Sequence, residues 1–135
     1  MNSNSEKIVL VADDDPVMIK LFQFNLSKAG FRVISCNDGD DVVNVALREN
    51  PSVALLDYLL PGRTGLELIS DFKEIPELAA LPTIIVTGQG KGSLRDELMR
   101  AGAKEVFTKP FSPSLLIEAI ERQTPAQSEI STQRK

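Results

Sequence analysis

The pattern that most restricts the fold of this chain is a regular alternation of short apolar runs with longer segments of helical period. The apolar runs have the length of strands and occupy residues 8–12, 33–36, 53–56, 84–86 and 106–107. Parallel strands need a crossover between them, which is usually a helix. About five such repeats therefore predict an α/β fold, a doubly wound parallel sheet with helices on both faces.

The segments between the runs carry apolar side chains at spacings of three and four, as amphipathic helices do. The expected core-facing residues are Val17, Met18, Leu21 and Phe22; Val42, Val43, Ala46 and Leu47; Leu66, Ile69 and Phe72; Leu94 and Leu98; and Leu115, Leu116, Ala119 and Ile120. The predicted start signals are Asp15-Pro16, Ser112-Pro113 and a capping box from Thr64 to Glu67. The predicted stop signals are Gly30, Pro51 and Gly102.

Length and composition predict one domain and narrow its chemistry. We expect the domain at 7–123, a disordered N-terminus at 1–6 and a polar C-terminal tail at 124–135. The chain has 19 acidic and 15 basic residues, net −4, which argues against direct binding to nucleic acid or an anionic membrane. It has no histidine, which excludes histidine bases and ligands. A single cysteine, Cys36, and no apolar run of about 20 residues predict a cytoplasmic protein without a membrane span.

Carboxylates gather where two of the predicted strands end. Asp13 and Asp14 directly follow the first strand, and Asp57 ends the third. Ligands of such sheets bind at the carboxyl ends of the strands, so these side chains are expected to share one site. Close carboxylates repel one another unless a cation neutralises them, and oxygen ligands suit Mg²⁺. The alternative interpretation is a solvated turn, and Asp15 is interpreted mainly as a helix cap.

Two further groups reach the same edge of the sheet. Thr87 closes the fourth apolar run, and Lys109 follows the fifth. Each has an ordinary explanation alone. Together with an aspartate nucleophile and a divalent cation, a hydroxyl and an ammonium supply what phosphorylation of Asp57 requires. The combination predicts a phosphoryl-transfer site.

Four motifs in order resemble the receiver domain of two-component response regulators. They are Val-Ala-Asp-Asp-Asp-Pro at 11–16, Leu-Leu-Asp-Tyr-Leu-Leu-Pro-Gly at 55–62, Val-Thr-Gly at 86–88 and Thr-Lys-Pro-Phe at 108–111. The resemblance covers about residues 7–123. It implies a flavodoxin-like (βα)5 fold, five parallel strands in the order 2-1-3-4-5. It also implies a phosphorylation switch that is not an enzyme.

The resemblance assigns a role to each site residue. Asp57 is the expected phosphoacceptor, Asp14 a direct Mg²⁺ ligand and Asp13 a ligand acting largely through water, while Leu59 offers its backbone carbonyl to the metal. The remaining residues are expected to bind the phosphoryl group through a hydroxyl, an amide and an ammonium; they are Thr87, Gly88 and Lys109. The expected Lys109-Pro110 bond is cis.

Some positions depart from the family pattern. Thr64 and Arg63 stand where members often have aspartate and methionine, and Val106 stands where many have an aromatic residue that moves on activation. Phe107 is expected on the opposite face of its strand, so it is no substitute. We therefore expect the loop at 88–92 and the helix after it to carry the signal. Leu59, with Gln89, is expected to tune hydrolysis, and an apolar Leu59 to prolong the phosphorylated state.

Several interpretations remain open at this level. The leading one is a switch that receives its phosphoryl group from a histidine kinase or a histidine phosphotransfer protein, either stand-alone or excised from a hybrid kinase or a larger regulator. A Mg²⁺-dependent aspartyl phosphatase, a flavin-binding module and a receiver that no longer takes phosphate are weaker alternatives. Output partners, or a second copy, would use the face formed by the fourth helix, fifth strand and fifth helix, with Lys91, Arg95, Arg100 and Lys104.

Overall fold

The strands form one parallel sheet in the order β2-β1-β3-β4-β5, as predicted. The computed structural model describes residues 7–88 and 92–124. The elements are β1 (Ile8–Ala12), α1 (Pro16–Lys28), β2 (Arg32–Cys36), α2 (Gly39–Glu49), β3 (Val53–Asp57), α3 (Gly65–Glu74), β4 (Thr83–Thr87), α4 (Gly92–Ala101), β5 (Glu105–Thr108) and α5 (Pro113–Gln123). The predicted strands differ from these by at most one residue at each end. Within the described ranges, no helix has the length and apolar character to cross a membrane.

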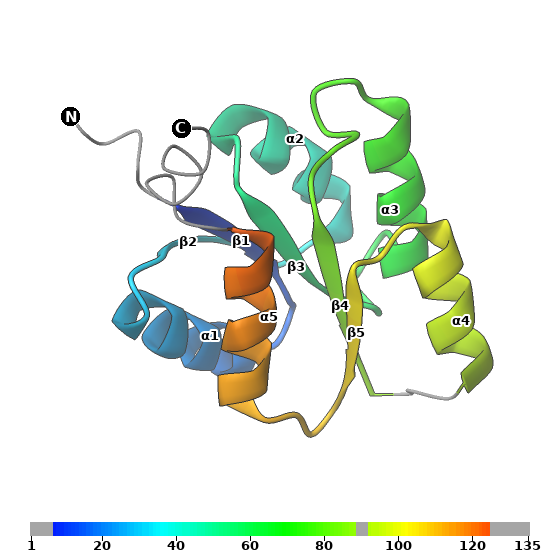
Figure 1. The fold of residues 1–135 in the computed structure, drawn as a ribbon. Coiled ribbons are helices and arrows are strands. Elements are labelled where there is room, and N and C mark those ends of the chain that lie inside the picture. The colour runs from blue at the N-terminus through cyan, green and yellow to red at the C-terminus, as the bar shows by residue number, and fades with distance from the viewer. Residues whose placement is uncertain (1–6, 89–91, 125–135) are drawn as a thin grey trace, which may run out of the picture.

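Helices cover both faces of the sheet, which places β3 and β4 in the interior. Helices α1 and α5 lie on one face, and α2, α3 and α4 lie on the other (Figure 1). Every residue of β3 and β4 is buried. Fully buried strands read as continuous apolar runs, as residues 53–56 and 84–86 do in the sequence. The two layers of core hold the ends of β3 and β4 in fixed positions.

Some residues expected in the core lie at the surface. Val17, Leu21, Leu47 and Leu115 are exposed. On α1, the contact with the sheet is made by Phe22 and Leu26, which are one turn apart. Leu21 precedes Phe22 by one residue and so lies about 100° around the helix. The predicted apolar faces were therefore wider than the stripes that actually meet the sheet.

The predicted boundary signals are confirmed. Asp15 and Ser112 cap α1 and α5 with their side chains, and Thr64 with Glu67 forms the capping box of α3. Gly30 has φ +97°, a conformation that glycine adopts without a steric penalty. The Lys109-Pro110 bond is cis, as expected.

The predicted domain limits are only partly covered by the described residues. Residues 1–6 and 125–135, where the disordered N-terminus and most of the polar tail were placed, lie outside them. Thr124, the first residue assigned to the tail, is buried and its hydroxyl donates to the Ile120 carbonyl at 3.0 Å. The limits at 7 and 123 stay a prediction.

Candidate phosphoryl-transfer site

The candidate site lies where β1, β3 and β4 end side by side. Asp57 is the last residue of β3, Thr87 is the last of β4, and Asp13 directly follows β1. Backbone hydrogen bonds continue the sheet just past these ends: the Tyr58 amide donates to the Val86 carbonyl and the Lys109 amide to the Thr87 carbonyl, both at 2.8 Å. The sheet thus delivers the predicted residues to one edge in a fixed register.

Three carboxylates converge at this edge. One oxygen from each of Asp13, Asp14 and Asp57 lies within 4.8 Å of the other two. Asp13 is 1% exposed and Asp57 is 9% exposed, whereas Asp14 is open to solvent. Two of the three carboxylates are therefore largely removed from water. In such a buried environment like charges repel more strongly than they do in water.

Burial is the main cause of the electrostatic character of this site. Desolvation raises the pKa of Asp57, and the nearby Lys109 ammonium opposes that rise. Desolvation also raises the pKa of Asp13, and the neighbouring Asp57 and Asp14 charges add to the effect. The Lys109 Nζ lies 3.2 Å from Asp57 Oδ1, which compensates one charge of the cluster. Lys109 pairs with Asp57 and so leaves the negative charges of Asp13 and Asp14 uncompensated among the described residues.

The residues at this edge fit a hard divalent cation. Asp13 Oδ1 accepts the Asp15 amide at 2.9 Å, but the buried Asp13 Oδ2 has no hydrogen-bond partner among the described residues. A buried carboxylate oxygen without a partner is costly, and a metal ion would remove that cost. The donor set is oxygen only, which Mg²⁺ prefers. Leu59, two residues after Asp57, is 63% exposed and so lies largely in solvent.

The predicted phosphate-binding residues border the same cluster. Thr87 is 2% exposed, and its carbonyl holds the amide of Lys109, whose ammonium reaches Asp57. Gly88 follows Thr87 directly and is exposed, with open space where a side chain would lie. Of the loop expected to move, residues 89–91 lie outside the described residues.

Residues of β5 have the predicted orientation. Val106 is buried in the core cluster on the α2, α3 and α4 face, and Phe107 packs against the cluster on the α1 and α5 face. Phe107 therefore does not replace the aromatic residue that Val106 lacks. The Val106 carbonyl accepts a hydrogen bond from the Arg95 guanidinium of α4 at 3.0 Å.

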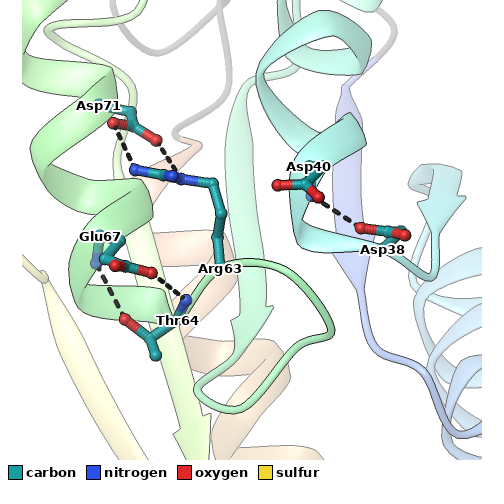
Figure 2. A network of polar contacts seen from close by, with 6 residues as sticks. All are labelled: Asp38, Asp40, Arg63, Thr64, Glu67 and Asp71. Atoms are coloured by element: carbon teal, nitrogen blue, oxygen red, sulfur yellow. Dashed lines mark hydrogen bonds and ion pairs between the residues drawn. The ribbon is translucent and has the colours of Figure 1, made fainter.

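The connection from β3 to α3 contains contacts that the sequence analysis missed. Arg63 donates two hydrogen bonds to Asp71 of α3, at 2.7 and 3.1 Å (Figure 2). The same view shows Asp38 and Asp40 at the start of α2, across from this loop. Asp71 lies seven residues after the N-cap Thr64, so it shares the face of α3 on which the helix begins. That spacing was the available signal.

Comparison with known proteins defines the class. A model of the response regulator receiver domain family matches residues 9–121. The chain therefore belongs to the response regulator receiver domain family, the receivers of two-component signalling.

Solved structures with the same fold include several receivers. A putative response regulator from Chloroflexus aurantiacus aligns with a TM-score of 0.83 at 27% identity, over 88% of this chain and 98% of that one. The BeF3-activated N-terminal receiver domain of Klebsiella pneumoniae RstA gives 0.81 at 24% identity, over 87% and 98%. The receiver domain of sensor histidine kinase PA1611 from Pseudomonas aeruginosa, with a magnesium ion coordinated in its active site cleft, gives 0.80 at 24%, over 88% and 98%.

Proposed function

We propose that this receiver is a phosphorylation switch in which Asp57 accepts a phosphoryl group. The observation that carries the proposal is the convergence of carboxylate oxygens from Asp13, Asp14 and Asp57 within 4.8 Å, with the Lys109 ammonium 3.2 Å from Asp57. The arrangement holds one nucleophile, acidic groups suited to a cation and one cation of its own. These are the elements of aspartyl phosphorylation.

In the proposed reaction a carboxylate oxygen of Asp57 attacks the phosphorus of a phosphohistidine. A P–O bond forms while the P–N bond breaks, and the imidazole of the donor leaves with the electron pair. These 135 residues contain no histidine, so the proposed donor is a phosphohistidine of a histidine kinase or of a histidine phosphotransfer protein. Lys109, already paired with Asp57, would form an ion pair with the transferred phosphoryl group. The Thr87 hydroxyl and the Gly88 amide would donate hydrogen bonds to the other phosphoryl oxygens.

Mg²⁺ is the proposed cofactor. Asp14 and Asp57 would bind it directly, Asp13 largely through water, and Leu59 through its backbone carbonyl. When bound, Mg²⁺ would neutralise negative charge on the carboxylates and on the transferred group. The PA1611 receiver, which has the same fold, holds a magnesium ion in its active site cleft, and the carboxylate cluster of this chain offers oxygen ligands for one.

The signal is proposed to leave through the face of α4, β5 and α5, toward an output partner or a second copy of the chain. Ion pairs and hydrogen bonds link these elements: Arg95 to the Val106 carbonyl, and Arg122 to Glu105 at 2.7 Å. Arg100 and Lys104 are exposed there, and Lys91 lies outside the described residues. A cytoplasmic location, where soluble phosphodonors occur, completes the proposal.

The test is Asp57-dependent modification. Wild type and Asp57→Ala would be incubated with acetyl phosphate and with beryllofluoride, each with and without Mg²⁺, and followed by intact mass and amide spectra. We expect one phosphoryl group on wild type only when Mg²⁺ is present, and none on Asp57→Ala. Glu74→Gln, which changes an exposed carboxylate at the last residue of α3, is the matched control and should react like wild type. Equal modification of the Asp57 variant would overturn the proposal.

The phosphatase alternative has a separate readout. An enzyme with an aspartyl intermediate would release many equivalents of phosphate from small phosphate esters per protein molecule. The proposed switch would release phosphate only as its own acyl phosphate decays. Sustained multiple turnover that depends on Asp57 would therefore contradict the switch and support the phosphatase.

A further inference from the structure

The loop between β3 and α3 is tied to two helices, although it begins right after the phosphoacceptor. Residues 58–64 form this loop, and we call it the β3–α3 loop. Its backbone closes on itself: Leu59 forms an isolated antiparallel bridge with Thr64, and the Gly65 amide donates to the Tyr58 carbonyl at 2.8 Å. Any displacement of Thr64 or its neighbour Arg63 is thus passed to the backbone of Leu59.

One anchor of the loop is the start of α2. The Gly39 amide donates to the Pro61 carbonyl at 2.7 Å. A Cβ at Gly39 would lie 2.9 Å from the backbone of Arg63 and Pro61, so glycine permits this close approach. Gly62 has φ +88°, and a Cβ there would lie 2.5 Å from the Asp40 carboxylate. The middle of the loop therefore rests directly on α2.

The second anchor is the ion pair between Arg63 and Asp71. In Figure 2 the Arg63 side chain runs from the loop along α3 to Asp71, beside the Thr64–Glu67 capping box. Two parallel hydrogen bonds at 2.7 and 3.1 Å fix both the distance and the orientation of the guanidinium. A bidentate pair of this kind is more directional than a lysine contact. It joins the end of the loop to the second turn of α3.

We propose that Arg63 and Asp71 are positioning residues for the metal site, because they brace the loop that presents the Leu59 backbone carbonyl. This inference rests on the proposed function, in which that carbonyl is a Mg²⁺ ligand. Groups that orient metal ligands typically contribute about 10–100-fold to metal affinity. Since Arg63 acts through the backbone, the effect belongs at the lower end of that range.

Charge and bracing predict opposite results for Arg63, which makes the proposal testable. Arg63 is a cation on the loop that leads out of the metal site. If only its charge mattered, Arg63→Ala would tighten Mg²⁺ binding, because removing a like charge favours a cation. If it braces the loop, the same variant would weaken binding. Asp71→Ala would weaken Mg²⁺ binding whether charge or bracing is the cause. The direction of the change in Mg²⁺ affinity in Arg63→Ala therefore decides between the two.

The experiment is a Mg²⁺ titration of the full chain, followed by calorimetry and by tyrosine fluorescence. Tyr58 is the single tyrosine, tryptophan is absent, and Tyr58 directly follows Asp57, so its emission reports on this site. We expect Arg63→Ala and Asp71→Ala each to raise the Mg²⁺ Kd roughly tenfold. The double variant should be no weaker than either single variant, because both remove the same brace. Arg63→Lys should recover only part of the affinity.

The control removes another arginine–carboxylate ion pair, one held by a single hydrogen bond. Arg48 pairs with Glu49 on the exposed side of α2 at 3.0 Å, and Arg48→Ala should leave the Mg²⁺ Kd unchanged. Thermal melting without Mg²⁺ would show that every variant is folded. If Arg63→Ala binds Mg²⁺ as tightly as wild type or more tightly, this inference is wrong, while the proposed function is unaffected. If wild type itself binds no Mg²⁺, the proposed function fails, and this inference fails with it.

Discussion

Asp57 is held where its own negative charge is disfavoured. Burial raises the pKa of this carboxyl, and the Lys109 ammonium at 3.2 Å only partly offsets the effect. A carboxylate with raised basicity is a better nucleophile, and a desolvated site strengthens interactions with an arriving cation. At the scale of single residues, the features that destabilise the free site are therefore those that suit phosphoryl transfer.

The residue-scale prediction concerns Leu59. Its side chain is 63% exposed two positions after Asp57, where an apolar group cannot orient a water molecule. Leu59→Asn would supply an amide that can, so we expect the acyl phosphate on Asp57 to decay several-fold faster. Decay would be followed by loss of the phosphorylated mass after donor removal. Leu59→Met, which keeps an apolar side chain, is the control, and an unchanged decay rate in Leu59→Asn would contradict the explanation.

At the scale of elements, α3 begins with a reciprocal cap that also ends the β3–α3 loop. The Glu67 amide donates to Thr64 Oγ1 at 3.2 Å, and the Thr64 amide donates to Glu67 Oε1 at 2.9 Å. Thr64→Ala would leave both helix-end groups less satisfied, so we expect a loss of about 1 kcal/mol in the free energy of unfolding. Urea denaturation would measure it. Thr64→Ser keeps the hydroxyl and should lose much less.

The fourth helix provides the second prediction at this scale. Val106 cannot make the aromatic movement used by many receivers, and Phe107 faces the other layer. We expect the signal to travel through the loop at 88–92 and through α4, because Thr87 immediately precedes that loop. Amide spectra of the beryllofluoride complex should show their largest changes there, beyond the residues that contact the phosphoryl analogue. A segment with unchanged shifts would sink this prediction.

At the scale of the whole molecule, stability and ligand binding are linked through the carboxylate cluster. The pKa of Asp13 and of Asp57 is raised in the folded state, mainly by burial. Protonation therefore stabilises the folded protein, and this stabilisation is lost as the pH rises through the raised pKa values. A divalent cation would replace the lost protons at neutral pH.

The corresponding prediction compares melting curves with and without Mg²⁺. As the pH rises from about 4 through the raised pKa of Asp57, Asp57→Asn should gain stability relative to wild type in Mg²⁺-free buffer, because only wild type loses a proton from residue 57. At Mg²⁺ concentrations about 100-fold above Kd, wild type at neutral pH should gain about 2.7 kcal/mol. Asp57→Asn should gain much less. Equal gains in both proteins would place the metal elsewhere.

The sequence by itself determined the order of the elements, the ends of the buried strands and the residues at those ends. These features are local: a continuous apolar run that stops at Asp57 or at Thr87 records both burial and its limit. The caps at Asp15 and Thr64 were readable for the same reason, since each cap bonds a backbone amide only two or three residues away. The family motifs then added the roles of these residues.

Only the tertiary structure decided which apolar faces are buried and how the β3–α3 loop is held. Val17 and Leu115 have the spacing of core residues but are exposed, because the contact width depends on how each helix sits on the sheet. The brace of Arg63 by Asp71 and the approach of Gly39 to Pro61 join separate elements. The approach of Gly39 to Pro61 leaves no periodic trace in the sequence, because it exists only after α2 has packed beside the β3–α3 loop. Helical spacing placed Asp71 on the face of α3 near its start, but it could not identify Arg63 as the partner.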